Sequence, residues 1–576
     1  MNAHRKRIVP EATGALGKST RPARTQAQAP TRLGRRTLLA ILKLAVTAAL
    51  GLIPAGRAAA QTQVNNDGAF PAAGLVLMGN TLYGTAQQGG TLGHGAVFAL
   101  NTDGTGFTNL HSLNASDGMN PYGCLAPSGN TLFGTANCGG GTGAGTVFRV
   151  NIDGSSFAPL YNFAATTGFP STNSDGADPY AGLILSGNTL YGTAEEGGTA
   201  GGGAVFAVNT DGTQFTNLHS FTATSSDGTN DINSDGAGPQ AGLLLSGNTL
   251  YGTVVEGGSW GGGAVFAVNT DGTGFTNLYS FTATSTNASG TFTNSDGTKP
   301  QAGLVLSSNT LYGTALAGGS SGEGTVFAIN TDGTGFTVLH SFTELANHTN
   351  SDGAVPHAGL VVSGNTLYGA AEYGGSSGNG TLFAIKTDGT GFTNLHSFTL
   401  LSLYGNNDDG TYPYGTLILS SNTLYGTALF GGSSGNGTVF AVNTDGTGFT
   451  NLHSFTPLAM LLPKLTITYD QGSVILKWPL DTAGSSMPYI LQSNTRVAHF
   501  GWTYFSFDSF IDNGQNVVVL PAYDAQAFYR LVPQNGHCAN DGGCPPGSIC
   551  VNGVHGSNRR GLGIRGIRRL SRHLLL

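Results

Sequence analysis

The stretch LYGTAEEGGTAGGGAVFAVNTDG, from Leu190 to Gly212, decides the fold. Two runs rich in Leu, Tyr, Val, Phe and Thr, which strands favour, flank a loop of glycines. The stretch ends on Asp211-Gly212, a dipeptide typical of hairpin turns. We therefore expect two antiparallel strands here and another strand after the Asp-Gly turn.

The neighbouring residues complete a four-stranded unit. Upstream, Gly187-Asn188 separates GLILS from TLYGTA and predicts a two-residue II′ hairpin with glycine at its first position. Downstream, FTNLHSF follows Asp211-Gly212 as the fourth strand. No segment of this region has the periodicity of a helix.

The unit recurs seven times. Its LYGT signature is centred on Tyr83, Phe133, Tyr191, Tyr251, Tyr312, Tyr368 and Tyr425, at spacings of 50 to 61 residues. An Asp-Gly follows each signature, and an Asp-Gly-x-x-Pro precedes each one. Four-stranded units of this length predict an all-β fold, a seven-bladed β-propeller over residues 61–456, because ring closure covers exposed strand edges. A linear β-solenoid is the alternative, although its repeats are usually shorter.

The repeated motif LYGTAxxGGxxGxGxVFAxNTDG resembles the bacterial GloVer (Gloeo/Verruco) tandem-repeat family. The resemblance covers roughly Asp67 to Phe455. It implies an exported repeat protein with a variable C-terminal part, and it implies no settled activity. Unit two, with Phe133 and Cys138, and unit six, with Ala370, depart from the motif, so we expect those blades to be irregular.

The N-terminus resembles an export signal. Arg35 and Arg36 precede an apolar run, Leu44 to Ile53, which is short for a bilayer span. Ala58-x-Ala60 fits a signal-peptidase site, so residues 1–60 are predicted to be a signal peptide and the mature chain to start near Gln61. An uncleaved membrane anchor is the alternative. Extracellular or cell-surface localisation follows, with a mature body that does not span the membrane.

The mature body is strongly acidic. Between Gln61 and His555 the sequence has seven Lys or Arg and 30 Asp or Glu, a net charge of about -23. Nucleic acid needs Lys and Arg for its phosphates, so nucleic-acid binding is excluded. Such a body suits cations, neutral glycans or simply solubility.

One face of the predicted propeller gathers the candidate site. With the first strand innermost, the fourth-to-first connections and the second-to-third loops lie on the same face. We expect the seven Asp-Gly-x-x-Pro aspartates there, together with loop residues that differ between copies. The binding candidates are Glu195, Glu196, Glu256, Trp260, Glu323, Glu372 and Tyr373, with His94 and Phe430 nearby.

Two familiar motifs are weak in this sequence. The GGxxGxG segments are followed by a strand, whereas a phosphate loop needs a helix. Asp231, Asn233 and Asp235 match the opening of a calcium loop, but Gly242 stands where the twelfth-position Glu belongs. A repeated Asp-Gly is more often a turn than a metal ligand, so we expect no cofactor. If the chain binds an ion, calcium is the candidate.

The histidine of NLHSF favours ring packing over metal ligation. It is replaced by Tyr161 in unit two and by Tyr279 in unit four. Tyrosine preserves a flat ring and loses the imidazole donor. No Ser-His-Asp arrangement can be defended, and a pair of carboxylates on the face is the only enzymatic option.

The repeat stops after the seventh unit. Residues 457–535 alternate like the strands of a small C-terminal β-sandwich. Residues 536–576 form a basic tail, expected to be disordered, with Cys538, Cys544 and Cys550 as disulfide candidates; together with His555 these are also a zinc ligand set. A bridge between Cys124 and Cys138 is left open.

Together these features predict an exported, non-catalytic surface or extracellular module that binds a glycan or protein partner. The alternative is a polysaccharide-active enzyme, a glycoside hydrolase or lyase, using carboxylates on the propeller face. A purely structural surface protein is the third class. An enzyme should show converging carboxylates in a deep aromatic pocket, a binder a shallow rim, and a structural protein neither.

Overall fold

The computed structural model describes residues 63–460, except 169, 227–229 and 289, and seven strands between residues 466 and 533. The predicted signal peptide, the three C-terminal cysteines and the basic tail lie outside the described residues. The described residues form strands, bridges, turns and bends but no helix.

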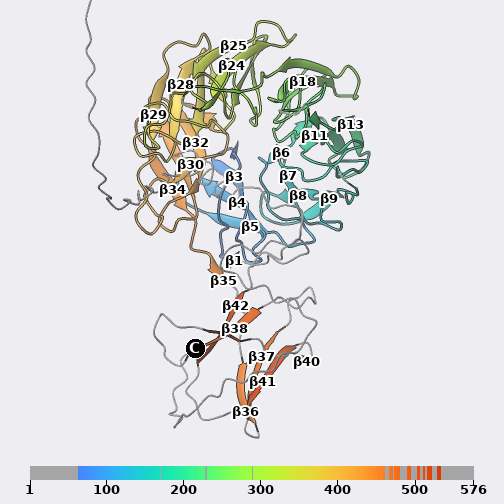
Figure 1. The fold of residues 1–576 in the computed structure, drawn as a ribbon, viewed down its shortest axis with the longest axis vertical. Helices are drawn as coiled ribbons and strands as arrows, with labels where there is room; N and C mark the ends of the chain where they lie inside the picture. Colours follow the sequence, from blue (N-terminus) through green and yellow to red (C-terminus); the bar gives the residue numbers. More distant parts are fainter. Residues whose placement is uncertain are drawn as a thin grey trace, which may run out of the picture. The chain divides into compact units, whose positions relative to one another are not determined.

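Six four-stranded antiparallel sheets and one five-stranded sheet form the blades, which we number one to seven; the fifth strand belongs to blade seven (Figure 1). The first strands are β2 (Val76–Met78), β6 (Ala126–Ser128), β10 (Ile184–Ser186), β16 (Leu244–Ser246), β22 (Val305–Ser307), β26 (Val361–Ser363) and β31 (Ile418–Ser420). The second strands are β3 (Thr81–Ala86), β7 (Thr131–Ala136), β11 (Thr189–Ala194), β17 (Thr249–Val254), β23 (Thr310–Ala315), β27 (Thr366–Ala371) and β32 (Thr423–Phe430).

The outer half of each blade repeats in the same way. The third strands are β4 (Ala96–Asn101), β8 (Thr146–Asn151), β12 (Ala204–Asn209), β18 (Ala264–Asn269), β24 (Thr325–Asn330), β28 (Thr381–Lys386) and β33 (Thr438–Asn443). The fourth strands, at the outer edge in Figure 1, are β5 (Thr108–Ser112), β9 (Ala158–Asn162), β13 (Thr216–Ser220), β19 (Thr276–Ser280), β25 (Thr337–Ser341), β29 (Thr393–Ser397) and β34 (Thr450–Ser454).

The opening stretch forms the strands that its residues predict. In blade three the sheet order is β10-β11-β12-β13, and Gly187, with a φ of 59°, turns the first hairpin. Gly192 lies in the middle of β11 because a Cβ there would be 2.6 Å from Cζ of Phe206 and 2.7 Å from Cδ2 of Leu183. The glycine of LYGT therefore makes room for the phenylalanine of the third strand.

The apolar core lies between the blades. Seven clusters of buried side chains each join one blade to the next. One of them packs Leu82 and Phe98 of blade one against Val439 and Phe455 of blade seven. The first and last blades are therefore neighbours, and the predicted seven-bladed closed propeller is confirmed.

Polar contacts between distant residues also close the ring. The carboxylate of Asp67, before blade one, lies 3.1 Å from Nε2 of His453 in β34 and accepts the N–H of Thr456 at 2.9 Å. Beside them, β1 (Gln63–Val64) pairs with β35 (Ala459–Met460). The segment before blade one thus makes the same contacts with blade seven that each connecting segment makes with the blade before it.

Shorter strands complete the repeat region. The hairpins β14 (Ser225–Ser226) with β15 (Asp231–Ile232), and β20 (Ser285–Thr286) with β21 (Phe292–Thr293), extend two of the segments between blades. In blade seven, β30 (Thr411–Pro413) pairs with the long second strand β32.

The chain after the propeller forms two further sheets. One has the order β36 (Thr466–Asp470), β37 (Ser473–Pro479), β41 (Gln515–Pro521), β40 (Phe510–Asp512). The other has the order β39 (Thr503–Phe505), β38 (Tyr489–Asn494), β42 (Phe528–Pro533). The strands fall where the sequence alternates. None of the described residues lies in a helix long and apolar enough to cross a bilayer.

Candidate functional site

The segments that connect one blade to the next share a face with the second-to-third loops. We call the segment between a fourth strand and the following first strand a connector. The connector before blade three bridges that blade's own loop at Ala177 and Glu196, and the connector before blade four does so at Ala237 and Glu256. The predicted assignment of these two sets of segments to one face is therefore confirmed.

The connector aspartates do not point out from that face. Asp235 is buried, its carboxylate lies 3.1 Å from Nε2 of His219, and it accepts the N–H of Thr222 at 3.0 Å and the hydroxyl of the same threonine. The seven equivalent aspartates are all buried. The aspartates lie in the connectors on the predicted face, but each is turned into the end of the preceding blade and is not exposed there to a ligand.

We call this arrangement a joint: the connector aspartate, the His or Tyr of the preceding fourth strand, and the second residue after that strand. The ring of His219 also stacks on Phe275 of the next blade, with centroids 3.7 Å apart. In the joint with Asp175, Tyr161 donates its hydroxyl at 2.7 Å and stacks on Phe215 at 3.9 Å. The histidine and tyrosine rings therefore stack in the same way on a phenylalanine of the next blade, as the sequence predicted.

Two of the three proposed calcium donors are already hydrogen bonded within the protein. Asn233 Oδ1 accepts the N–H groups of Gly236 and Gly258, both at 2.8 Å. The carboxylate of Asp235 is held as described above, and Asp231 is exposed. The described residues contain no group of three or more His, Cys, Asp or Glu side chains placed to hold a metal. The calcium site stays a prediction, with two of its side chains already hydrogen bonded.

One backbone position on the face is strained in every connector. The residue before each connector proline has a positive φ, between 55° and 66°. These residues are Phe70, Asn120, Asp178, Gly238, Lys299, Val355 and Tyr412. Each of their N–H groups donates to a carbonyl of the preceding blade's second-to-third loop, as Asp178 does to Ala144 at 2.9 Å. The backbone is thus the same seven times, while the side chain differs in all seven.

The residues after the same prolines surround the propeller axis. They are Ala72, Tyr122, Tyr180, Gln240, Gln301, His357 and Tyr414, and we call this ring and the loops above it the mouth. A glycine one or two residues further on brings neighbouring blades into backbone contact, since a Cβ on Gly182 would lie 2.6 Å from the carbonyl oxygen of Cys124.

Side chains of the ring touch one another around the axis. Tyr122 stacks on Tyr180 with centroids 4.4 Å apart, and the hydroxyls of Tyr180 and Tyr414 lie 3.0 Å apart across the ring. His357 stacks on Tyr414 at 3.5 Å. Burial raises the pKa of Tyr180 well above its usual range, although part of that side chain is accessible.

One wall of the mouth is acidic. Gln240 donates to Oε1 of Glu195 at 2.6 Å. The charges of Glu196 and Glu256 act on Glu195. Burial, then the charges of Glu196 and Glu195, raises the pKa of Asp178 to about 7. Burial likewise raises the pKa of Glu195 to about 7, against the opposing hydrogen bond from Gln240.

Aromatic rings dominate blades six and seven and the start of blade one. Ring centroids are 5.1 Å apart for Tyr373 and Tyr412, 5.9 Å for Tyr412 and Phe430, and 5.1 Å for Phe430 and Phe70. All four side chains are partly exposed. Beside them Glu372 is 4% exposed, and burial raises its pKa to about 7 against a hydrogen bond from Tyr373.

The predicted binding residues therefore divide into separate groups. Glu195, Glu196 and Glu256 lie together on the acidic wall. Glu372 and Tyr373 belong to the aromatic side. Glu323 is buried in the loop of blade five, where its carbonyl accepts the N–H of Val355, and Trp260 is exposed in the loop of blade four.

Sequence reasoning missed the ring residues and Asp178. A usable signal was present, because the positions on either side of each connector proline vary between copies while the proline is constant. The glycine-rich GGxxGxG motif directed the prediction to the second-to-third loops instead. In GGTAGGG itself, Gly203 has a φ of 94°, and a Cβ there would lie 2.5 Å from Cδ of Pro239. The loop reverses the chain against the next connector, as the strand-reversal interpretation predicted.

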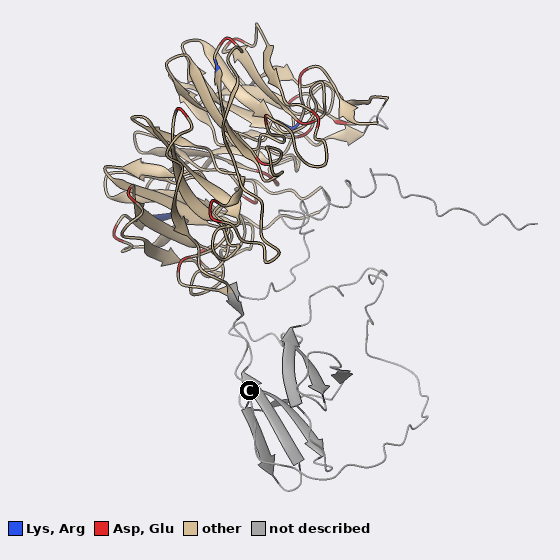
Figure 2. Ribbon diagram, turned by 90° about the vertical axis from the view of Figure 1, so that its left-hand side faces the viewer, with Lys and Arg blue, Asp and Glu red and all other residues tan. Residues whose placement is uncertain are grey.

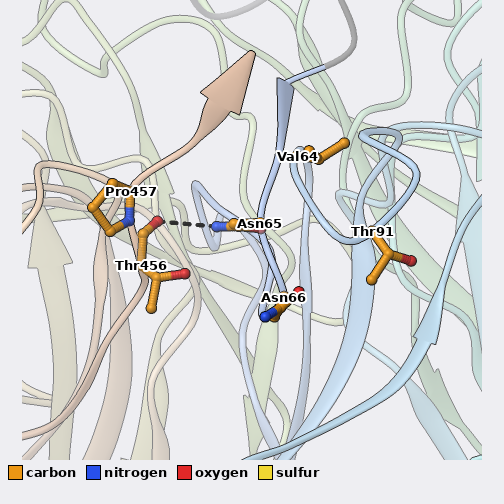
Figure 3. A pocket seen from close by; sticks show the side chains of 6 residues that line it. All are labelled: Val64, Asn65, Asn66, Thr91, Thr456 and Pro457. Atoms are coloured by element: carbon orange, nitrogen blue, oxygen red, sulfur yellow. Dashed lines mark hydrogen bonds between the residues drawn. The ribbon is translucent and has the colours of Figure 1, made fainter. Parts of the chain in front are cut away.

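A shallow depression of about 380 Å³ lies where the ring closes. Figure 3 shows its lining, with Asn65 donating to the carbonyl of Thr456 at 3.0 Å. The remaining lining residues are Val64, Asn66, Thr91 and Pro457. None of them carries a charge or a nucleophile suited to catalysis, so we assign this depression to ring closure.

The two cysteines of blade two are not bonded to each other. Cys124 lies at the axis and Cys138 on the face, and burial raises the pKa of both thiols. Neither has the lowered pKa of a reactive cysteine.

Comparisons with known proteins identify the repeat. A family model described as the Gloeobacter/Verrucomicrobia repeat matches residues 54–174, 168–291 and 282–475. The sequence matches no curated protein.

Solved structures with some likeness come from varied proteins. A 6-phosphogluconolactonase-like protein of Bacteroides uniformis is 16% identical, with a TM-score of 0.41, over 67% of this chain and 97% of its own. A nidogen/laminin complex is 14% identical, with a TM-score of 0.32, over 57% and 93%. A puromycin-hydrolyzing peptidase of Mycobacterium tuberculosis is 12% identical, with a TM-score of 0.40, over 72% and 62%. Likeness at this level says nothing about activity.

Proposed function

This chain belongs to the Gloeobacter/Verrucomicrobia repeat family, and we propose that it is an exported, non-catalytic binding module whose propeller mouth holds a glycan. Repetition and the propeller fit a scaffold. The glycan, its place outside the cell and the absence of catalysis are our proposal. A protein partner is the other outcome of the test below.

One observation carries this proposal. The residue before each connector proline keeps a left-handed backbone in all seven connectors, and six of the seven are not glycine. A non-glycine residue pays about 1 kcal/mol or more for this conformation. Glycine would adopt this conformation at a lower cost in free energy, so the six other side chains serve recognition in this proposal. They are Phe, Asn, Asp, Lys, Val and Tyr.

The chemistry of the mouth suits a saccharide. Aromatic faces offer apolar contact to sugar rings, while the amides of Gln240 and Gln301 and the carboxyls of Asp178 and Glu195 offer partners to hydroxyl groups. Concave sites with a few convergent polar groups are the usual form of small-ligand sites.

A carbohydrate array probed with the full chain tests the proposal. We expect binding to a subset of glycans, and weaker binding by a Tyr180→Ala variant that melts normally. Tyr404→Ala is the matched control, because Tyr404 is an exposed tyrosine in the connector before blade seven and is not one of the ring residues. Binding by both variants at the wild-type level, or binding only to proteins, would remove the glycan from the proposal.

The enzymatic alternative rests on a second observation. Asp178 and Glu195 are neighbouring carboxyls whose pKa values burial raises to about 7, as a general acid requires near neutral pH. Release of reducing ends from the glycans that bind, lost in Asp178→Asn and in Glu195→Gln, would establish a glycosidase. Binding without release supports the module.

The chain after the propeller also enters the proposal. We propose that the two sheets from β36 to β42 pack as the small sandwich that their alternating sequence predicts. Export through residues 1–60 is checked by sequencing the mature N-terminus, which we expect near Gln61. A mature protein that begins at Met1 would contradict it.

A further inference from the structure

The mouth has an excess of hydrogen-bond acceptors and almost no cation. Residues 63–460 contain only Arg149, Lys299 and Lys386 as basic residues, against 24 Asp or Glu. Figure 2 shows acidic residues along the loops of the blades and basic residues at few places. Of the three cations, Lys299 alone belongs to a connector; the other two lie in third strands.

Two buried oxygen atoms beside the ring lack a hydrogen-bond partner. They are Oε1 of Gln87 and Oε1 of Glu372, which occupy the same position in the loops of blades one and six. The side chains are 3% and 4% exposed. An unpaired buried polar atom costs about 1–3 kcal/mol, so such atoms are uncommon without a function.

The buried carboxyl of Glu372 acts on the floor of the mouth. Its charge raises the pKa of both Tyr180 and Tyr414, after the larger effect of burial. The charge of Glu195 acts on Tyr180 as well. Glu195 of blade three and Glu372 of blade six therefore both act on Tyr180, and within the part of the chain that the structure describes neither forms an ion pair with Lys or Arg.

We propose that the ligand of the mouth is a saccharide that carries ammonium groups, an amino-sugar oligomer. This inference rests on the proposed function and names its ligand class. Ammonium N–H groups supply the donors that an acceptor-rich site lacks. A cation over the Tyr and Phe faces gains about 0.5–2 kcal/mol from each close ring contact.

The partly exposed carboxyls make the direct contacts. Glu195, Asp178 and the exposed Glu256 are accessible on the acidic wall. Glu372 is closed off from solvent, so it acts through its charge beneath the tyrosines. The amide of Gln240 is engaged on both sides, because it donates to Glu195 and accepts from the amide of Gln301. The tyrosine faces of the ring remain for the apolar faces of a sugar, and this mixture favours a sugar over a lysine-rich peptide.

Calorimetric titration of the full chain with matched hexamers tests this assignment. We expect a glucosamine hexamer to bind at least tenfold more tightly than an N-acetylglucosamine hexamer or cellohexaose, and added salt to weaken it. Glu256→Lys, an exposed substitution that should not disturb folding, is expected to weaken it at least tenfold. Glu344→Gln, an exposed acid on the connector before blade six, is the matched control and should leave it unchanged.

Each other outcome overturns the inference in a recognisable way. Equal binding of the glucosamine and N-acetylglucosamine hexamers would keep the glycan and remove the ammonium group. Tighter binding of a lysine hexamer would assign the mouth to a cationic protein. Failure of every hexamer, together with an empty carbohydrate array, would overturn the proposed function as well.

Discussion

The joints and the mouth are built from the same connectors, yet they follow opposite rules. At the joint, the aspartate is constant and its partners vary little: the ring is histidine or tyrosine, and the residue whose N–H the carboxylate accepts is threonine in all but two joints, which have Asn114 and Ala164. A few residues further on, at the mouth, the backbone is constant and the side chains differ. A repeat scaffold thus separates what must be identical for seven blades to close from what is free to recognise a ligand.

Removing the joint that closes the ring should have the largest effect. Asp67→Ala breaks the contacts with His453 and Thr456, which lie 386 and 389 residues away in sequence. Loss of several hydrogen bonds to a buried carboxylate should cost about 3 kcal/mol of unfolding free energy. Hydrogen exchange should also show blade seven opening before the rest.

Asp235→Ala is the matched control for this change. It removes the same kinds of contact within a continuous stretch, with His219 16 residues away. A similar loss of stability is expected, without selective opening of blade seven. If both variants exchange alike in every blade, the connector before blade one is not what closes the ring.

The aspartate joints also predict a loss of stability in acid. Burial alone would raise the pKa of Asp67, but hydrogen bonds from His453 and Thr456 hold it below its usual value. Asp235, Asp352 and Asp409 are lowered by the same pattern. A lowered carboxyl pKa gives stability that is present above the unfolded pKa, near 4, and is lost as pH falls through the folded pKa. Melting temperatures should therefore drop steeply below about pH 4.

Glu372 in the mouth should show the opposite dependence on pH. Its pKa is raised to about 7 in the folded protein, so the fold binds the proton more tightly than the unfolded chain does. Stability should fall as pH rises from about 4.5 to 7. Glu372→Gln removes this loss and should stabilise the protein by about 2 kcal/mol at pH 8, with little change at pH 4. An equal effect at both pH values would contradict a buried, ionising Glu372.

Glycine at a strained mouth position should stabilise the fold. Val355 has a φ of 58°, which is unusual for a β-branched residue. Val355→Gly should relieve the strain and raise unfolding free energy by about 1 kcal/mol, after the entropy that glycine costs. Gly238→Val, at the same position of blade four, should destabilise. Thermal melting of the two variants checks this, and a destabilising Val355→Gly would mean that the side chain is structural.

The smallest effect concerns an imperfect joint. Asp175 Oδ1 has no partner, because Ala164 stands where the equivalent joints of Asp235, Asp296 and Asp352 have a threonine hydroxyl. Ala164→Thr should add about 1 kcal/mol. Ala164→Val, of the same shape without the hydroxyl, should not. Equal melting of the two variants would show that the hydroxyl contributes nothing.

The fold was predictable because it is repeated, and the site was not because it is variable. Seven copies of LYGT and Asp-Gly establish strands, turns and their number, and the hairpin at Gly187 confirms the expected turn. The same repetition did not reveal that the aspartates are buried, because their spacing does not show that a histidine lies against the carboxylate. That histidine is six to 16 residues earlier in sequence, or in blade seven for Asp67. The mouth depends on positions such as Tyr180 and Tyr414, whose contact joins residues 234 apart and exists only after closure.

The most direct test compares the full chain with its Tyr412→Gly variant on one carbohydrate array, with melting temperatures measured alongside. Tyr412 has a φ of 57° and a partly exposed ring in the mouth. We predict that the wild type labels a subset of glycans, and that the variant loses this labelling while melting no lower than the wild type. Unchanged labelling by the variant, or no labelling by the wild type, would contradict the account.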